Sequence, residues 1–342
     1  MRRKLIWGVI ALLIAGMVIR TVMAQSAALS PRSLIVTMAH TPPAWMVLIL
    51  LSMAGFIVFE ALALRCILTG LGYPTSFRHA LLYSAGDQFF SAITPSATGG
   101  QPASALFMGA HSLPAGTITV TLLLNLVLYT AATLTIGLGI FALRPHVLGL
   151  FGPMSRALIL LGMTALIGLA LVFLLLLTRG AYLERHGGKL IRLLSKLRLM
   201  KYPDKWMDQL QHLVLEYKLC AKKAYEKPGM LLGAFTLDLA QRISQISVTL
   251  LVYLSQGGNP RLGADLWSVQ ALAQIGSNWV PIPGGMGAAD YLMLDGFQKL
   301  MQGDAVYSLQ LLSRGFSFYV CSLVSGIIVL IGFICLRRQK HK

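Results

Sequence analysis

Long runs of apolar residues alternate with polar breaks along this chain, and the pattern predicts membrane-spanning helices. One helical residue adds about 1.5 Å, so each run is long enough to cross a hydrocarbon layer of about 30 Å. Six such segments are expected, at residues 5–24, 44–65, 117–141, 157–178, 229–256 and 310–336. The sequence therefore predicts an all-α polytopic membrane protein.

The longest polar break, residues 179–228, predicts how these helices are oriented. It holds twelve Lys and Arg residues against five acidic ones. Cytoplasmic loops carry an excess of Lys and Arg, so we expect this break in the cytoplasm. The basic ends of the chain, "MRRK" and "RRQKHK", are expected on the same side.

Two stretches must then begin and end on one side of the membrane. Counting crossings places both ends of residues 79–110 inside and both ends of residues 266–303 outside. Each stretch has a break rich in Pro and Gly, "TPSATGGQP" in the first and "PIPGGMG" in the second. Their first arms, 79–93 and 266–280, would each extend about 22 Å as helices and reach only the middle of the bilayer. Irregular backbone at that depth must be buried in protein or line a polar cavity, so both stretches are predicted to be re-entrant helical hairpins.

The two halves of the chain are predicted to be inverted copies of each other. Residues 44–141 run helix, hairpin, helix, and residues 229–336 repeat this order with the opposite orientation. We expect one membrane domain over residues 1–342, with six transmembrane helices, two opposed re-entrant hairpins and the basic segment 179–228 between the halves. Broken helices at matching positions of inverted halves indicate a transport site near the bilayer midplane.

Composition agrees with this picture. The 342 residues are 56% hydrophobic and 12% charged, with a net charge of +17. In a polytopic protein this basic excess is explained by cytoplasmic loops, so no nucleic-acid partner is expected. The four cysteines have no metal or redox spacing. The N-terminal run resembles a signal peptide ending near Ala24, although an uncleaved first helix is favoured.

Six charged residues lie inside the predicted membrane segments, where each costs about 2.5–3.5 kcal/mol on insertion scales. They are Glu60, Asp87, Asp238, Arg242, Asp290 and Arg314. Asp238 and Arg242 are four residues apart on one helix and can form an ion pair. This pair could belong to a charge or proton relay with Glu60 and Asp87, or it could be purely structural.

Three of these residues have two interpretations each. Asp87 and Asp290 could line a transport site or cap helices. Arg314 has no obvious partner, so it could bind a lipid phosphate or extend to the interface. The second arm of each hairpin also presents backbone amides that favour an anion.

Signals for an enzyme are weak. The sequence has no zinc-protease, nucleophile-elbow or phosphate-loop motif and no Cys/His cluster. No catalytic residue, metal or cofactor is expected. The basic stretch 189–201 has one leucine-rich face, and it could lie on the inner leaflet or pack as a cytosolic helical hairpin.

The two breaks together resemble a known family. "SAITPSATGGQP" and "VPIPGGMGAAD", in this order, are similar to the lysylphosphatidylglycerol synthase transmembrane region, a flippase-like membrane family. The matching positions are Thr94, Pro95, Ser96, Gly99, Gly100, Gln101 and Pro102 in the first motif and Pro281, Pro283, Gly284, Gly285 and Gly287 in the second. Many members have Glu at the positions of Gln101 and Asp290.

The resemblance implies lipid translocation. We expect a flippase that moves a phosphate-bearing lipid between leaflets of a bacterial inner membrane, with the motif residues, Asp290 and Arg314 at the substrate. Fused members carry an aminoacyl-transferase domain, and this chain is expected to be the flippase part alone. An intramembrane lipid-modifying enzyme using Asp87 or Asp290, or an accessory subunit of a lipid or glycan synthase, are the alternatives. A homo-oligomer is left open.

The inverted hairpins can be tested by labelling from each side. Single cysteines replacing Ala97 and Met286 in a cysteine-free background should react with an impermeant thiol reagent from opposite sides, Ala97→Cys from the cytoplasm. Labelling of both positions from one side would contradict the inverted arrangement.

Overall fold

The computed structural model describes residues 41–94, 99–178, 215–278, 287–301 and 303–339, and all regular structure in these ranges is helical. The predicted segment 5–24, most of the basic break and both hairpin tips lie outside the described residues. The helices are α3 (Pro43–Leu71), α4 (Phe77–Ile93), α5 (Gly100–Ala110), α6 (Ala115–Leu143), α7 (Pro153–Thr178), α10 (Pro228–Ser255), α11 (Gly263–Ser277), α12 (Ala288–Phe297), α13 (Asp304–Arg314) and α14 (Cys321–Gln339). Short 3₁₀ helices cover Pro145–Leu150 and Pro260–Leu262, and a π-helix over Gly315–Val320 joins α13 to α14.

The apolar segments coincide with these long helices, so the multi-pass membrane character is confirmed. Four helical stretches are long and apolar enough to cross a membrane: Pro43–Leu71, Ala115–Leu143, Pro153–Val172 and Ala305–Arg337. α10 has 28 residues but is not among them. Its apolar sequence is interrupted by charged and amide side chains, which the structure turns inward.

Each predicted hairpin appears as two short helices that pack on each other, α4 with α5 and α11 with α12. The first arms have 17 and 15 residues, close to the predicted lengths. α4 begins after Ser76, whose hydroxyl accepts a hydrogen bond from the amide of His79. The arms therefore begin as the pattern predicted, while the side from which each enters a membrane remains a prediction.

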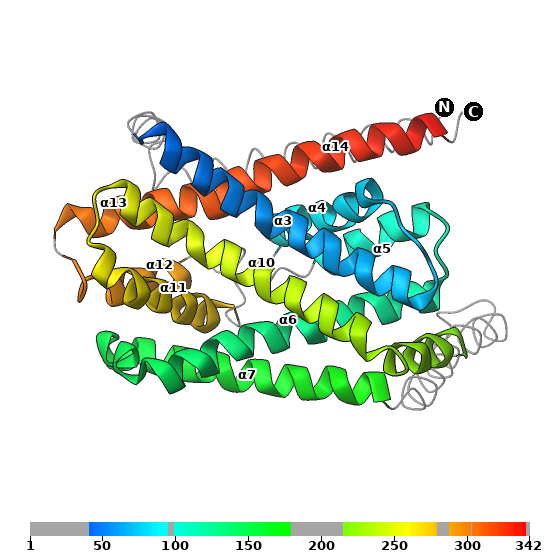
Figure 1. Cartoon of the computed structure of the whole chain (residues 1–342), viewed down its shortest axis with the longest axis horizontal. Helices are drawn as coiled ribbons and strands as arrows, with labels where there is room; N and C mark the ends of the chain where they lie inside the picture. Colours follow the sequence, from blue (N-terminus) through cyan, green and yellow to red (C-terminus); the bar gives the residue numbers. More distant parts are fainter. Residues whose placement is uncertain (1–40, 95–98, 179–214, 279–286, 302, 340–342) are drawn as a thin grey trace, which may run out of the picture.

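The helices are arranged around an antiparallel central pair, α3 and α10, which make the most extensive contact of the fold. α14 packs on α4 along one flank, and α6 and α7 lie along the other. The α4–α5 hairpin and the α11–α12 hairpin lie toward opposite ends of this pair (Figure 1). Large apolar side chains of α7 and α14, such as Leu171 and Leu330, are exposed, as expected of surfaces that face lipid.

Glycines allow α7 and α11 to approach closely. A Cβ atom on Gly162 would lie 2.4 Å from the backbone oxygen of Ile275, and one on Gly276 would lie 3.3 Å from the Cα atom of Ile159. Small residues at such crossings let the backbones pack closely, and this van der Waals packing stabilises membrane helix pairs, which lack a hydrophobic driving force for association. This crossing fixes the first arm of the second hairpin against a predicted spanning helix.

Replacing Gly162 by Leu should therefore force the two backbones apart. We expect Gly162→Leu to lower the free energy of unfolding by about 1–3 kcal/mol, as overpacking does elsewhere. Thermal unfolding in detergent measures this, with Gly168→Leu as the matched control on the same helix, because a Cβ atom there would have no neighbour within 4 Å. Equal effects of the two variants would contradict the close crossing.

Candidate functional site

The buried charged side chains of the described chain, Glu60, Asp238 and Arg242, all lie on the central helix pair. Of the predicted site residues, Thr94, Gly99, Gly100, Gln101, Pro102, Gly287, Asp290, Arg314 and the four proposed relay residues are described. Pro95, Ser96, Pro281, Pro283, Gly284 and Gly285 lie outside the described residues.

α10 has a polar face that runs along the centre of the fold. Asp238, Gln241, Arg242, Gln245 and Thr249 recur every three or four residues, which places them on one side of a helix. All but Gln245 are buried, with Asp238 at 0% and Arg242 at 4% exposure. A buried polar face on a membrane helix indicates a cavity or a ligand path rather than a lipid-facing surface.

Glu60 on α3 is the centre of an acidic cluster. Its Oε2 accepts hydrogen bonds from Ser84 Oγ at 3.0 Å, from Gln241 Nε2 at 3.1 Å and from Gln88 Nε2. The donors come from α4 and α10, so this one carboxyl group joins the first hairpin to both central helices. It is 3% exposed.

Asp87 on α4 joins the two arms of the first hairpin. It accepts hydrogen bonds from Ser91 Oγ at 3.2 Å and from Gln101 Nε2, in α5, at 3.1 Å. Its carboxyl group also lies beside that of Glu60. Gln101, a motif residue, therefore binds an acid within its own hairpin.

The glycines of the first motif permit this closure. A Cβ atom on Gly100 would lie 1.8 Å from Asp87 Oδ1 and 2.6 Å from the Asp87 backbone oxygen. The amide of Gly99 donates to Thr94 Oγ1 at 2.8 Å, and this hydroxyl donates to the Phe90 backbone oxygen at 2.6 Å. The motif therefore brings the start of α5 directly onto α4.

The base of the same hairpin carries two stacked histidines. The rings of His79 and His111 lie 3.8 Å apart, and Tyr83 Oη is 2.9 Å from His111 Nδ1. Burial, and then the neighbouring His79, lower the pKa of His111, which lies in the turn before α6. The base is therefore held by an aromatic cluster of two histidines and a tyrosine.

Arg242 is a buried cation with no carboxylate partner among the described residues. Its Nη1 donates to Gln245 Oε1 at 2.8 Å, and Gln274 Nε2 of α11 donates to the same oxygen at 2.5 Å. The guanidinium group lies over the rings of Tyr129 and Phe56, at 4.1 and 5.2 Å from their centroids. Its Nε has no hydrogen-bond partner in the described structure.

The ion pair considered between Asp238 and Arg242 is not formed in the described chain. Both carboxyl oxygens of Asp238 are buried without a hydrogen-bond partner there. The four-residue spacing put the two side chains on one face, but the guanidinium group turns toward Gln245 and the aromatic rings. The carboxyl group and the guanidinium group thus lie on one face of α10 without a direct ion pair.

A small pocket opens beside Arg242, between α6, α10 and α11. Its polar lining comes from Arg242, Thr133 and Gln274, and its apolar lining includes Ile136 and Ile246. The cavity has a volume of about 10 Å³, which is about the room that one water molecule needs. A lipid headgroup bound there would require α6, α10 and α11 to move apart, while its acyl chains would remain in lipid.

Arg314 is paired, which corrects its assignment as an unmatched cation. Its Nε lies 3.1 Å from Asp290 Oδ1, and its guanidinium group is 5.4 Å from the centroid of the Phe318 ring. Asp290 Oδ2 accepts a hydrogen bond from the amide of Gly287 at 3.1 Å, directly before α12. The capping interpretation of Asp290 is therefore confirmed, and Gly287 has the positive φ, 78°, that this turn requires.

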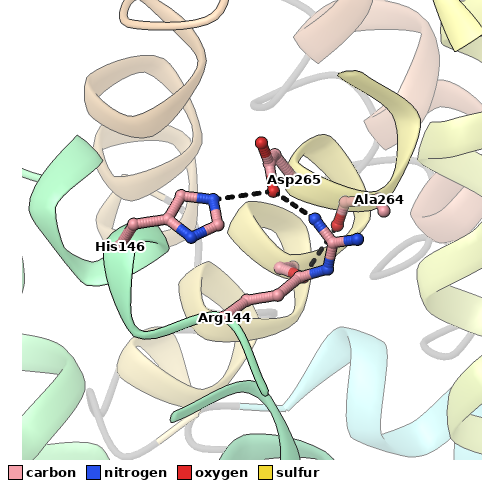
Figure 2. Close-up of polar contacts among 5 residues, drawn as sticks. Arg144, His146, Ala264 and Asp265 are labelled. Atoms are coloured by element: carbon pink, nitrogen blue, oxygen red, sulfur yellow. Dashed lines mark hydrogen bonds and ion pairs between the residues drawn. The ribbon is translucent and has the colours of Figure 1, made fainter. Parts of the chain in front are cut away.

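An additional polar cluster fixes the start of the second hairpin. Asp265, in the first turn of α11, lies 2.6 Å from Arg144 Nη1 and 3.0 Å from His146 Nε2 (Figure 2). The two basic residues follow α6, so the cluster joins the end of α6 to the hairpin. Its side chains are more exposed than the central cluster, and we assign it a structural role.

The sequence interpretation missed the glutamines. Four glutamines connect both hairpins to the central helices: Gln88, Gln241, Gln245 and Gln274. None was predicted as a site residue, because only charged side chains were expected to mark a site inside the membrane segments. Amides in apolar segments are a usable signal, since they hydrogen-bond across membrane helices. No group of three or more His, Cys, Asp or Glu side chains that could hold a metal ion occurs within the described ranges.

Comparison with known families decides the identity of this arrangement. The family model described as "Lysylphosphatidylglycerol synthase TM region" matches residues 8–325. The chain belongs to this family. Comparisons with curated proteins and with solved structures gave no significant match.

The family match covers both hairpins and the polar face of α10. It confirms the resemblance carried by the two motifs and supports a membrane protein related to lipid modification or flipping. In the matched region, the described motif residues hold the two arms of each hairpin together. The buried cation Arg242 lies on α10, between the two hairpins.

The contact of Gly100 with Asp87 gives a direct test of the motif. We expect Gly100→Ala to separate α5 from α4 and lower the free energy of unfolding by about 1–3 kcal/mol, because the added Cβ atom meets backbone as well as side chain. Gly109→Ala on the same helix is the control, since its nearest new neighbour would be 4.0 Å away. Thermal unfolding that does not distinguish the two variants would rule out this role of the motif.

Proposed function

We propose that the protein is a flippase, which moves an anionic, phosphate-bearing lipid between the leaflets of a bacterial inner membrane. It has six membrane crossings, with both termini in the cytoplasm, and two hairpins that enter from opposite sides. The lipid headgroup passes through the polar interior beside α10, while its acyl chains stay in the bilayer.

The buried guanidinium group of Arg242 carries this proposal. A cation at membrane depth is retained only when it has a partner or a function, and Arg242 has no ion pair within the described chain. Arginine binds phosphate through paired hydrogen bonds. Its Nε is without a partner, and the pocket beside it is lined by the additional polar side chains of Thr133 and Gln274.

The hairpin tips are less suited to the phosphate. The start of α5 lies against the Asp87 carboxyl group, and the start of α12 donates to the Asp290 carboxylate. Each second arm therefore already has an acid of the chain at its N-terminus, where an anionic headgroup was expected. Arg314 is likewise paired with Asp290. We therefore assign the binding of the anionic headgroup to Arg242.

Matching positions in the two halves support the inverted arrangement. Pro43 begins α3 as Pro228 begins α10. In the first half Gln88 of the hairpin donates to Glu60 of the central helix, 28 residues before it, and in the second half Gln274 donates to Gln245, 29 residues before it. A hydrogen bond from a hairpin glutamine to a central helix thus occurs in each half. Its acceptor is the carboxyl group of Glu60 in the first half and, in the second half, the amide oxygen of Gln245, which also binds Arg242.

This charge difference sets which part of the path an anionic headgroup occupies. An anionic headgroup is attracted to the half that contains Arg242 and repelled by an ionised Glu60 or Asp87. The proposal requires no chemical change of the lipid. A synthase that supplies the lipid, or a second copy of the chain, is compatible with it.

Neutralising Arg242 should stop lipid movement without unfolding the protein. We expect Arg242→Gln to slow the transfer of a fluorescent anionic phospholipid in proteoliposomes about tenfold or more, since a charged hydrogen bond contributes about 1.5–3 kcal/mol. Arg242→Lys should retain part of the rate, because it keeps the charge and loses the paired geometry.

Arg144→Gln is the matched control, because it removes an arginine from the exposed cluster at Asp265. It should leave the rate unchanged. Wild-type protein that alters the lipid mass would favour the enzyme alternative, and an Arg242→Gln variant with the normal rate would refute the headgroup site.

A further inference from the structure

The two acids at the first hairpin form a unit that the headgroup site does not use. Glu60 lies on α3 and Asp87 on α4, and their carboxyl groups lie beside each other. Ser84 and Gln88, which precede and follow Asp87 on α4, both donate to Oε2 of Glu60, as does Gln241 of α10. We propose that Glu60 and Asp87 share one proton and that this dyad is the proton-binding site which couples proton movement to lipid movement. The coupling part rests on the proposed function.

A hydrogen bond between the two groups would need a proton. Two carboxylates are acceptors only, so such a bond exists only when one carries hydrogen. Two like charges on neighbouring buried groups cannot both ionise without a large cost, as in other carboxylate pairs that titrate as one unit. The dyad is therefore in a singly protonated state when the hairpin is closed.

The groups around the dyad favour a proton over a metal cation. The side-chain atoms that reach Glu60 and Asp87 are hydroxyl groups and amide nitrogens acting as donors, from Ser84, Gln88, Ser91, Gln101 and Gln241. A sodium or calcium ion would need several oxygen atoms directed at it. Donors instead stabilise the one negative charge that remains on the pair.

Buried acceptors beside the dyad indicate where the proton can go. Gln241 is 1% exposed and aims Nε2 at Glu60, yet its Oε1 has no partner among the described residues. Asp238, one turn earlier on α10, is 0% exposed with both oxygens unpartnered. These acceptors lie on the same face of α10 as Arg242.

The charged and titratable groups facing the dyad come from two further elements. α10 contributes Asp238 and Arg242, and Arg242 interacts electrostatically with Asp87 and with Asp238. Cys321, at the start of α14, interacts electrostatically with Glu60. Arg242 is the one cation among them, so a bound anionic headgroup would weaken its attraction for the carboxylates.

The electrostatic interaction between Arg242 and the dyad links binding of the headgroup to binding of the proton. When the headgroup neutralises Arg242, the negative charge of the dyad loses its nearest counter-charge and a proton binds more readily. When the proton leaves, two carboxylates repel each other across the α3–α4 contact and the hairpin separates from α3. One proton is taken from water on one side and released to water on the other, with no bond otherwise made or broken.

The test uses full-length protein in proteoliposomes with an imposed pH gradient. The wild type should accumulate a fluorescent anionic phospholipid in one leaflet, and reversing the gradient should reverse the accumulation. Glu60→Gln and Asp87→Asn should still exchange lipid between leaflets but lose at least tenfold of the gradient-driven accumulation. Asp295→Asn is the matched control and should behave as the wild type, because Asp295 accepts a hydrogen bond from the Gly152 amide, which an Asn can also do.

A second readout does not depend on transport. Infrared spectra of the purified protein should show the carbonyl band of a protonated carboxyl group at neutral pH, which disappears in Glu60→Gln and persists in Asp295→Asn. Absence of this band in the wild type, accumulation driven by a sodium gradient instead, or normal gradient response in both dyad variants would overturn the proposal. If the wild type moves no lipid, the proposed function fails, and the band alone decides whether the proton is shared.

Discussion

Polar groups inside a bilayer have no water to bind, and this constraint explains most of the structure. Every buried acid, amide and cation must find its partner within the protein or hold a ligand. The chain meets this requirement by packing α3 against α10 and facing the polar side chains of both inward. Glu60 alone receives donors from α4 and α10, so the position of the first hairpin depends on satisfying one carboxyl group.

The same constraint makes the exceptions informative. Buried side-chain atoms without a hydrogen-bond partner occur on several of the described helices, and the ionisable groups among them, Asp238 and Arg242, both lie on α10. Hydrogen bonds missing from the interior of a membrane protein are costly. The presence of both ionisable groups on α10, between two broken helices, is the reason for assigning the headgroup to this place rather than to the hairpin tips.

The sequence predicted the elements well because helices and breaks follow from local composition. The apolar segments, the short hairpin arms and the cap formed by Asp290 depend on neighbouring residues, and the structure has those that fall within the described residues. The partners of Arg242 and Arg314 depend on tertiary contacts. Arg314 meets Asp290 from another helix, and Arg242 turns from the nearby Asp238 to rings of α3 and α6. Spacing along one helix cannot reveal such choices.

The glutamines show a further limit of sequence reasoning. Gln88 and Gln274 appear as ordinary polar residues in the sequence, and their equivalence becomes visible only when each is seen to bind its own central helix. The repeat that we propose for the halves is therefore one of contacts more than of residue types. In this proposal, the acid pair of one half and the arginine of the other give the two halves different tasks.

The central claim is that the guanidinium group of Arg242 holds the anionic headgroup of a lipid within the protein. An experimental high-resolution map of the protein in nanodiscs containing anionic phospholipid tests it most directly. We predict phosphate density within hydrogen-bonding distance of Arg242 Nε, in the pocket between α6, α10 and α11. An empty pocket with Arg242 paired to Asp238, and phosphate density only at the hairpin tips, would contradict the account.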